Sequence, residues 1–106
     1  MTTPASRFDE VEWIARTETV GVRINVLGPG KATPWHYHTA VADDAFGLET
    51  PVEIGLRGPD ETIALGPGQR VHIAPGRVHR VVNPAQTPAR YLLVQATGRY
   101  DFNEVP

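Results

Sequence analysis

Glycine and proline interrupt this chain too often for long helices to form. Ten glycines and ten prolines occur in 106 residues, and proline removes a backbone hydrogen-bond donor while glycine costs helix stability. Turn signals made of these residues recur at Gly28-Pro29-Gly30, Gly58-Pro59-Asp60, Gly66-Pro67-Gly68, Ala74-Pro75-Gly76 and Asn83-Pro84. Short runs rich in β-branched residues lie between them, and this rhythm predicts an all-β sandwich or barrel.

Alternating side chains indicate where the strands lie. Over residues 20–27, Val20, Val22, Ile24 and Val26 alternate with Gly21, Arg23, Asn25 and Leu27, the period of a half-buried strand. The same period recurs over 52–57, and further strands are expected at 61–65, 69–73, 78–82 and 91–96. Apolar residues at helical spacing occur only in Arg7–Ala15, where one short N-terminal helix is weakly indicated.

Composition narrows the possible partners and sites. The length of 106 residues is that of one domain, and a net charge of -2 gives no broad positive field for nucleic acid or an anionic membrane. The chain has no cysteine, so any metal must bind to imidazole and oxygen ligands. We find neither a signal-peptide core near the N-terminus nor an apolar run of membrane-spanning length, and we expect a cytoplasmic protein.

All four histidines lie in two short segments, residues 34–38 and 70–79. On a strand, His36 and His38 would project from the same face, roughly 6 to 7 Å apart, and could share one metal ion. A His-x-His pair by itself is more often two surface histidines than a metal site. The wider spacing around the histidines therefore decides the interpretation.

That spacing resembles the two motifs of the cupin superfamily. The first motif, a glycine, His-x-His and an acidic residue, corresponds to Gly30, His36, His38 and Asp43, and the second, a glycine, Pro-x-Gly, a histidine and an asparagine, to Gly68, Pro75, Gly76, His79 and Asn83. The resemblance covers residues 30–83 and implies a small single-domain (type-2) cupin over residues 1–106. It implies a jelly-roll β-barrel, also called a double-stranded β-helix. Residues 98–106 are expected to form a surface strand or C-terminal arm.

The resemblance also implies a set of metal ligands. In cupins the corresponding side chains bind one metal ion inside the barrel, and here they are His36, His38, Asp43 and His79. The chain departs from the family pattern, with Asp43 in place of the usual glutamate, Thr50 in place of a glycine and Ala74 in place of a proline. Because aspartate is one methylene shorter than glutamate, two alternatives stay open. Asp44 could supply the carboxylate, or three histidines could bind the metal with the carboxylate supporting them.

Such ligands suit a divalent transition metal. Fe(II) or Mn(II) is favoured, with Zn(II), Ni(II), Co(II) and Cu(II) as alternatives. With four protein ligands, an octahedral ion keeps two positions for water, dioxygen or a bidentate substrate. We expect a metal-dependent enzyme on a small organic substrate, either an oxidoreductase of the dioxygenase kind or an isomerase or lyase working through a metal-bound enolate. The alternative is a non-catalytic cupin that binds or senses a small molecule, so enzymatic activity stays an open question.

Four more residues are candidates for the site. Tyr91 and Gln95 share one face of the last strong strand, and a buried glutamine needs a hydrogen-bonding partner, so both are expected to contact a substrate. A solvent-facing place at the strand end fits Gln95 equally well. Phe46, close to Asp43, is expected to line the cavity or the plain core. No catalytic residue is assigned, and His72 is only a weak acid–base candidate, because a surface or supporting role fits it better.

The last expectation concerns oligomeric state. Single-domain cupins commonly dimerise through their sheets, and the resemblance implies a homodimer here. Aromatic residues on exposed strands would be natural interface residues, and the candidates are Trp13, Trp35, Tyr37, Tyr100 and Phe102. We expect the arm over 98–106 to place Tyr100 and Phe102 on a neighbouring subunit.

Overall fold

A computed structural model of the chain describes residues 10–106 and contains strands but no helix within that range. Its strands are β1 (Glu10–Arg16), β2 (Val20–Leu27), β3 (His36–Tyr37), β4 (Ala42–Gly47), β5 (Val52–Leu56), β6 (Glu61–Leu65), β7 (Arg70–Ile73), β8 (His79–Val82), β9 (Ala89–Ala96) and β10 (Asn103–Glu104). The all-β prediction is confirmed. Two strands, β2 and β6, have the predicted bounds, and β5 ends one residue before the predicted end at 57. β4 was not predicted, and β10 lies within the predicted C-terminal strand or arm over 98–106.

The predicted N-terminal helix is wrong where the structure describes it. Glu10–Arg16 form β1, which pairs with β2 in an antiparallel ladder that is shifted between Trp13 and Ala15. Pairing with β2 satisfies the backbone of this aromatic and β-branched segment, and tertiary context of this kind outweighs a weak helical periodicity. Residues 7–9 of the predicted helix lie outside the described range.

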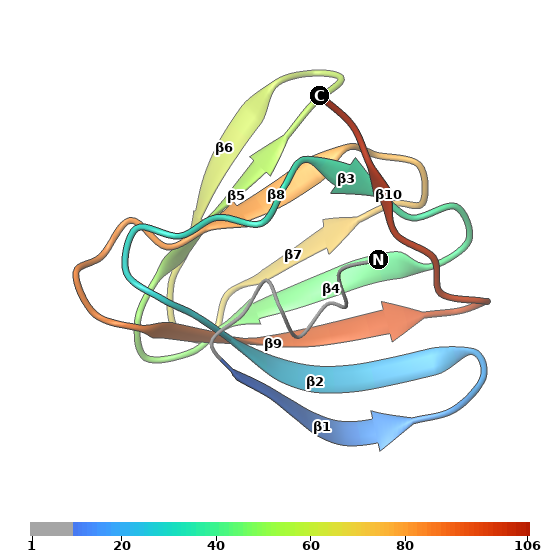
Figure 1. The fold of residues 1–106 in the computed structure, drawn as a ribbon, viewed down its shortest axis with the longest axis horizontal. Helices are drawn as coiled ribbons and strands as arrows, with labels where there is room; N and C mark the ends of the chain where they lie inside the picture. The colour runs from blue at the N-terminus through green and yellow to red at the C-terminus, as the bar shows by residue number, and fades with distance from the viewer. Residues whose placement is uncertain (1–9) are drawn as a thin grey trace.

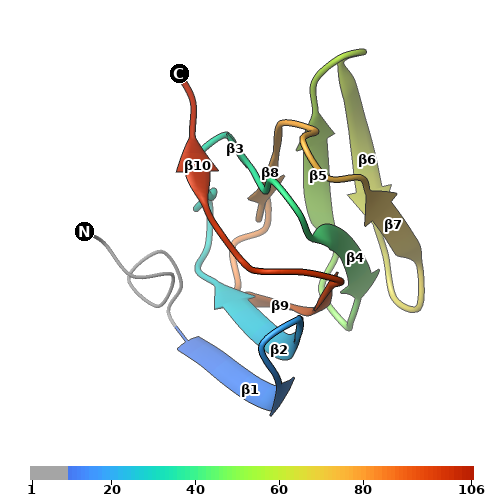
Figure 2. The same cartoon turned by 90° about the vertical axis from the view of Figure 1, so that its right-hand side faces the viewer.

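The strands form two five-stranded antiparallel sheets, in the orders β1-β2-β9-β4-β7 and β10-β3-β8-β5-β6. Figure 1 shows them as two stacked layers, and Figure 2 shows the same layers from the side. From β2 to β10 the chain repeatedly crosses between the layers, which is the double-sheet arrangement of a jelly roll. Among residues 10–106 there is no helix able to span a membrane.

The interior changes from apolar to polar along neighbouring strands of the first sheet. On β9, Ala89, Tyr91, Leu93 and Gln95 are buried in turn, and the antiparallel β2 buries Leu27, Asn25 and Arg23 beside them. The valines and isoleucine of β2 therefore lie on the outer, half-buried face, although they are its most apolar residues. The inner face of β2 instead carries two buried polar side chains, Arg23 and Asn25, beside Leu27.

Asn83 joins two turns at the apolar end of the barrel. Its buried Nδ2 donates to the carbonyl oxygens of Leu27 at 2.9 Å, Gly28 at 3.1 Å and Thr87 at 2.8 Å. Its Oδ1 accepts a hydrogen bond from the backbone N–H of Ala85 at 2.9 Å. One side chain thus satisfies backbone groups of the β2–β3 and β8–β9 connections, which would otherwise be buried without partners.

Candidate metal centre

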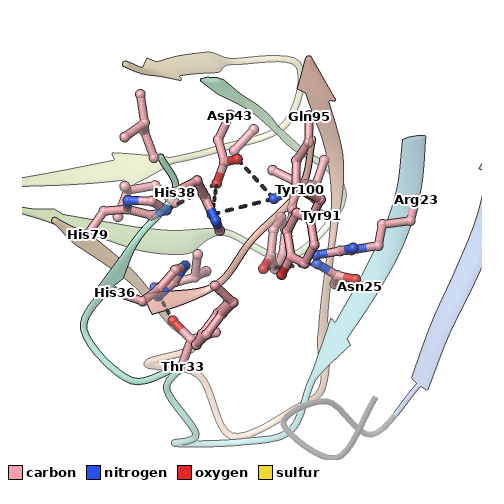
Figure 3. Close-up of a pocket in the computed structure, with 16 residues that line it drawn as sticks. Arg23, Asn25, Thr33, His36, His38, Asp43, His79, Tyr91, Gln95 and Tyr100 are labelled. Carbon is pink, nitrogen blue, oxygen red and sulfur yellow. Dashed lines mark hydrogen bonds and ion pairs between the residues drawn. The ribbon is translucent and has the colours of Figure 1, made fainter. Parts of the chain in front are cut away.

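Three buried histidines, His36, His38 and His79, converge inside the barrel. His36 of β3 lies directly opposite His79 of β8 in the ladder, and His38 follows β3 on the same side as His36. One ring nitrogen from each lies within 4.8 Å of the others. Figure 3 shows the three rings on one side of the pocket. The structure therefore brings together the three histidines that the sequence predicted as ligands.

Backbone carbonyl oxygens orient all three imidazole rings. Nδ1 of His36 lies 2.7 Å from the carbonyl oxygen of Pro34, and Nδ1 of His79 lies 2.8 Å from that of Arg77. Nδ1 of His38 lies 2.7 Å from the carbonyl oxygen of Asp101. Because a carbonyl oxygen only accepts, each Nδ1 must carry a proton. A ring that is neutral then keeps its lone pair on Nε2, as in metal-binding histidines held by outer hydrogen bonds, whereas a ring that donates to a carboxylate through Nε2 carries a second proton.

A tight turn places His38 at the end of β3. The backbone N–H of Gly76 donates to the carbonyl oxygen of His38 at 2.7 Å. Gly76 has a φ of 82°, in the left-handed region that side chains other than glycine rarely adopt. Gly76 of the second motif therefore allows the β7–β8 turn to adopt the conformation in which its backbone hydrogen-bonds to His38.

Asp43 reaches the histidines from the opposite sheet. It lies on β4, is almost completely buried, and places Oδ2 3.0 Å from Nε2 of His79 and 3.4 Å from Nε2 of His38. Its other oxygen, Oδ1, accepts a hydrogen bond from Nε2 of Gln95 at 3.0 Å. Asp43 and Gln95 are direct neighbours across the β4–β9 ladder. The carboxylate is thus aimed at the face of the cluster where the ring lone pairs point.

The ionisation of the cluster follows from burial and from this carboxylate. Burial lowers the pKa of His36 to about 3, so its ring stays neutral. Burial alone would raise the pKa of Asp43, but hydrogen bonds with His38 and His79 outweigh it and hold that pKa below its usual range. Burial also acts to lower the pKa of His38, but the hydrogen bond and charge of Asp43 raise it overall. The histidine nitrogens and the Asp43 carboxylate therefore favour a proton or a cation between them.

A divalent cation fits this donor set. Nitrogen lone pairs and a carboxylate oxygen that meet in a buried space repel one another unless a proton or a metal ion lies among them. Imidazole and carboxylate are ligands for divalent transition metals, and three histidines with one acidic group leave coordination positions for a substrate. Because bonds to such an ion are about 2.1 Å long, ligands at right angles lie about 3 Å apart, close to the distance between Asp43 and His79.

Asp44, the alternative carboxylate ligand, and His72, the weak acid–base candidate, lie on the outer face of β4 and β7. Nδ1 of His72 is 2.9 Å from Oδ1 of Asp44, and the His72 side chain is 52% exposed. Arg70 lies on the other side of Asp44, with Nε 3.6 Å from the same oxygen. The period of β4 and β7 turns these side chains away from the histidines, so the structure brings Asp43 and not Asp44 to the cluster.

Two of the three candidate substrate-binding residues lie in the pocket and one lies on the outer face of the sheet. Tyr91 and Gln95 both line the pocket that contains the histidines, and both are buried. Phe46 is half-buried on the outer side of β4 and does not line that pocket. The side chain of Gln95 is buried and does not face solvent. The carboxylate of Asp43 provides the hydrogen-bonding partner that a buried amide requires.

The C-terminal arm covers the histidines of its own chain. Phe102 stacks on His36, with ring centroids 4.2 Å apart and planes at 16°, and the Tyr100 ring centroid is 5.4 Å from that of His38. β10 pairs with β3, so the arm lies along the strand that supplies His36, as Figure 1 shows. The arm therefore places both rings in the pocket, where the sequence had suggested a neighbouring subunit.

The rest of the pocket has an apolar wall and a polar end. Apolar residues from both sheets form the wall, namely Ala45, Ile54, Ile73, Val81 and Leu93. Arg23, Asn25 and Thr33 add polar groups that the sequence analysis did not single out. For Arg23 and Asn25 the signal was present, because both lie among the alternating residues of β2, but it did not tell which face of the strand is inside.

Known structures share this architecture. Protein TT1209 from Thermus thermophilus is 27% identical, with a TM-score of 0.75 over 84% of this chain and 83% of that chain. The polyketide cyclase RemF from Streptomyces resistomycificus is 24% identical, with a TM-score of 0.68 over 85% of this chain and 63% of its own. Oxalate oxidase in complex with the substrate analogue glycolate is 16% identical, with a TM-score of 0.78 over 92% of this chain and 55% of its own.

Sequence comparison agrees with the fold. No curated protein sequence matches the chain. Residues 24–95, however, match the profile of the Cupin domain family, and that stretch holds all four residues of the candidate metal centre. With the jelly-roll fold and the buried histidine cluster already described, the match establishes that this chain belongs to the cupin family.

Proposed function

We propose that this cupin binds one divalent metal ion through His36, His38, His79 and Asp43 and acts as a metal-dependent enzyme on a small organic substrate. The observation that carries the proposal is the convergence of three imidazole rings whose Nδ1 atoms are all engaged by carbonyl oxygens. Among the metals, we favour Fe(II) or Mn(II), which accept nitrogen and oxygen ligands together. Asp43 is proposed as the fourth ligand because its Oδ2 points to the same centre as the rings.

A metal ion bound there would supply Lewis-acid polarisation of a substrate oxygen, or activation of dioxygen beside a chelated substrate. The residues of the chain would do the rest. The apolar wall excludes water from one side of the substrate, and Phe102 covers His36 from another. Gln95 holds the Asp43 carboxylate through its Oδ1 and leaves Oδ2 directed at the histidines. These features favour an enclosed reaction rather than an exposed metal-storage site.

Metal content is the first test. We would purify the full chain without a histidine tag or chelator and determine its metals by elemental analysis, beside a His36→Ala/His79→Ala double variant. His72→Ala is the matched control, because His72 is exposed and bonded to Asp44 on the outer face. We expect close to one equivalent of metal in the wild type and the control and none in the double variant. No metal in the wild type, even after reconstitution, would refute the proposal.

The choice of reaction needs turnover assays. The similarity to oxalate oxidase and to the polyketide cyclase lies below 25% identity and supports the fold alone. Metal-loaded protein should be tested on 1,3-diketones, hydroxy acids and phenols, with dioxygen uptake separating dioxygenase chemistry from isomerase or lyase chemistry on an enolisable substrate. Thermal stabilisation by one of these compounds without turnover would instead favour a binding or sensing cupin.

We also propose that two copies of the chain pack through the outer face of the β1-β2-β9-β4-β7 sheet. Ile24, Leu92 and Phe46 follow one another across β2, β9 and β4, and all three are only partly buried in the isolated chain. Acidic residues of β1 flank this row on one side and Arg70 of β7 on the other. A two-fold axis parallel to the strands would bring the acidic edge of each copy against the basic edge of its partner.

A further inference from the structure

Arg23 is a buried cation at the polar end of the candidate metal pocket. Its side chain extends inward from β2, and the residue is only 5% exposed. In Figure 3 it lies across the pocket from the histidines, with the tyrosine side chains between them. Arginine is among the residues least often buried to this degree without a partner of opposite charge.

No acidic side chain among residues 10–106 forms an ion pair with Arg23, and its Nε finds no hydrogen-bond partner within that range. Two aromatic rings lie near its guanidinium, whose carbon is 5.1 Å from the Trp13 ring centroid and 5.8 Å from that of Tyr100. Cation–π contacts at such distances offset only a fraction of the cost of removing a guanidinium from water. The charge of Arg23 therefore calls for an anion that residues 10–106 do not provide.

Asn25 gives a second, independent indication two residues along the same strand. It is completely buried, and its Nδ2 donates to the hydroxyl oxygen of Tyr91 at 3.2 Å. Its Oδ1 has no hydrogen-bond partner within the described part of the chain. Arg23 and Asn25 face the same side of β2, so a charged donor and an amide with unused hydrogen-bonding capacity stand side by side in the pocket.

Arg23 also lines a second hollow next to the metal pocket. A second hollow lies against the β1–β2 hairpin and shares Arg23, Gln95 and Tyr100 with the metal pocket. Arg16 lines this outer hollow, with its guanidinium carbon 4.3 Å from the Trp13 ring centroid. Glu18 lines the outer hollow as well and offsets the charge of Arg16, whereas Arg23 is a charged residue that lines both hollows.

We propose that Arg23 and Asn25 anchor a small organic carboxylate, with its carboxylate on the guanidinium, a neighbouring polar group on Asn25, and the remainder directed toward the histidines. Arginine binds carboxylates through paired hydrogen bonds, and the apolar wall of the pocket suits the rest of a small acid. The inference rests on the proposed function, because the anchored acid would be the substrate of the metal centre. Binding at Arg23 can nevertheless be measured without any metal.

The first test compares acids with uncharged analogues of nearly the same shape. Lactate, isobutyrate and benzoate would each be titrated against the corresponding amide, using NMR chemical shifts and metal-free and metal-loaded full-length protein. We expect at least one acid to bind about 10-fold more tightly than its amide in both forms of the wild type, and Arg23→Gln to abolish the difference. Arg90→Gln is the matched control, because Arg90 is exposed and paired with Glu49.

These outcomes separate the two proposals. Metal binding in wild type and in Arg23→Gln, without any preference for acids over amides, would overturn the anchoring role and leave the metal centre intact. An acid preference that depends on Arg23 in a protein that binds no metal would uphold the anchor and refute the proposed enzyme. Equal acid binding by Arg23→Gln and wild type would also overturn the anchor.

A second test requires no choice of ligand. If Arg23 is kept for binding, the ligand-free protein carries an uncompensated buried charge, and Arg23→Met should raise the Tm by about 4 °C or more. If the guanidinium instead serves to hold Trp13 and Tyr100 together, the same variant should lower the Tm. A lower Tm for Arg23→Met would therefore contradict the proposal.

Discussion

The carbonyl oxygen of Asp101 accepts a hydrogen bond from Nδ1 of His38 at 2.7 Å, across 63 positions of the sequence. The Asp101 side chain reinforces this contact, because its Oδ1 accepts a hydrogen bond from the backbone N–H of Thr39 at 2.8 Å. Phe102, the next residue, stacks on His36. The C-terminal arm is therefore part of the candidate metal centre, since it orients one histidine and covers another.

Removing the arm should weaken metal binding. A chain that ends at Gly98 lacks the acceptor for Nδ1 of His38, and loss of such supporting hydrogen bonds typically costs metal affinity about 10- to 100-fold. Competition with a chelating dye would measure the change, and circular dichroism would check that the sheets persist. Glu104→Gln, which keeps the backbone of β10, is the control. Unchanged affinity in the shortened chain would show that the arm does not orient His38.

The carboxylate of Asp43 should matter where that of Asp44 does not. Asp43→Asn keeps the shape of the side chain but removes its charge from the histidine cluster, and we expect metal affinity to fall about 10-fold or more. Asp44→Asn, one residue away, changes the outer face only and should leave the affinity as it is. The same dye competition measures both. If Asp43→Asn leaves the metal affinity unchanged, as Asp44→Asn should, the site would be a three-histidine site without the Asp43 carboxylate.

Asn83 should be a strong determinant of stability. Asn83→Ala removes the donor to three carbonyl oxygens and the acceptor for Ala85. Buried backbone groups without partners are costly, so the free energy of unfolding should fall by about 3 kcal/mol. Urea denaturation would measure it. Gln86→Ala in the same turn is exposed and should change stability by less than about 0.5 kcal/mol. A similar small effect of Asn83→Ala would mean that water replaces its bonds.

The proposed dimer predicts that one substitution in the interface should give a monomer. Ile24→Glu places a charge in the middle of the partly exposed apolar row formed with Leu92 and Phe46, and burying it between two copies would be unfavourable. Light scattering at micromolar concentration should give a dimer mass for the wild type and a monomer mass for Ile24→Glu. Glu53→Gln, on β5 of the other sheet, should stay dimeric. A monomeric wild type would remove the proposal.

Local sequence alone was sufficient for much of the architecture. Glycine and proline exclude long helices over most of the chain through backbone chemistry. Alternation identified the strand at 20–27 with correct bounds and the strand at 52–57 with one residue too many, and composition identified the strand at 61–65. The resemblance of the segments around His36, His38 and His79 to the two cupin motifs also predicted a shared site. These features depend on interactions between residues that are near in sequence or on motif spacing, so one chain is enough to read them.

Only the tertiary structure decided which face of each strand is inside. Alternation in β2 is the same whether the valines or Arg23 and Asn25 point inward, because a period of two has no preferred side until a second sheet packs on it. Short strands such as β10 have too few residues to carry a pattern at all. The contacts of Asp101 with His38 and of Phe102 with His36 could not be predicted from the sequence either. They depend on the path of the chain between distant segments, and that path is determined by packing of the two sheets.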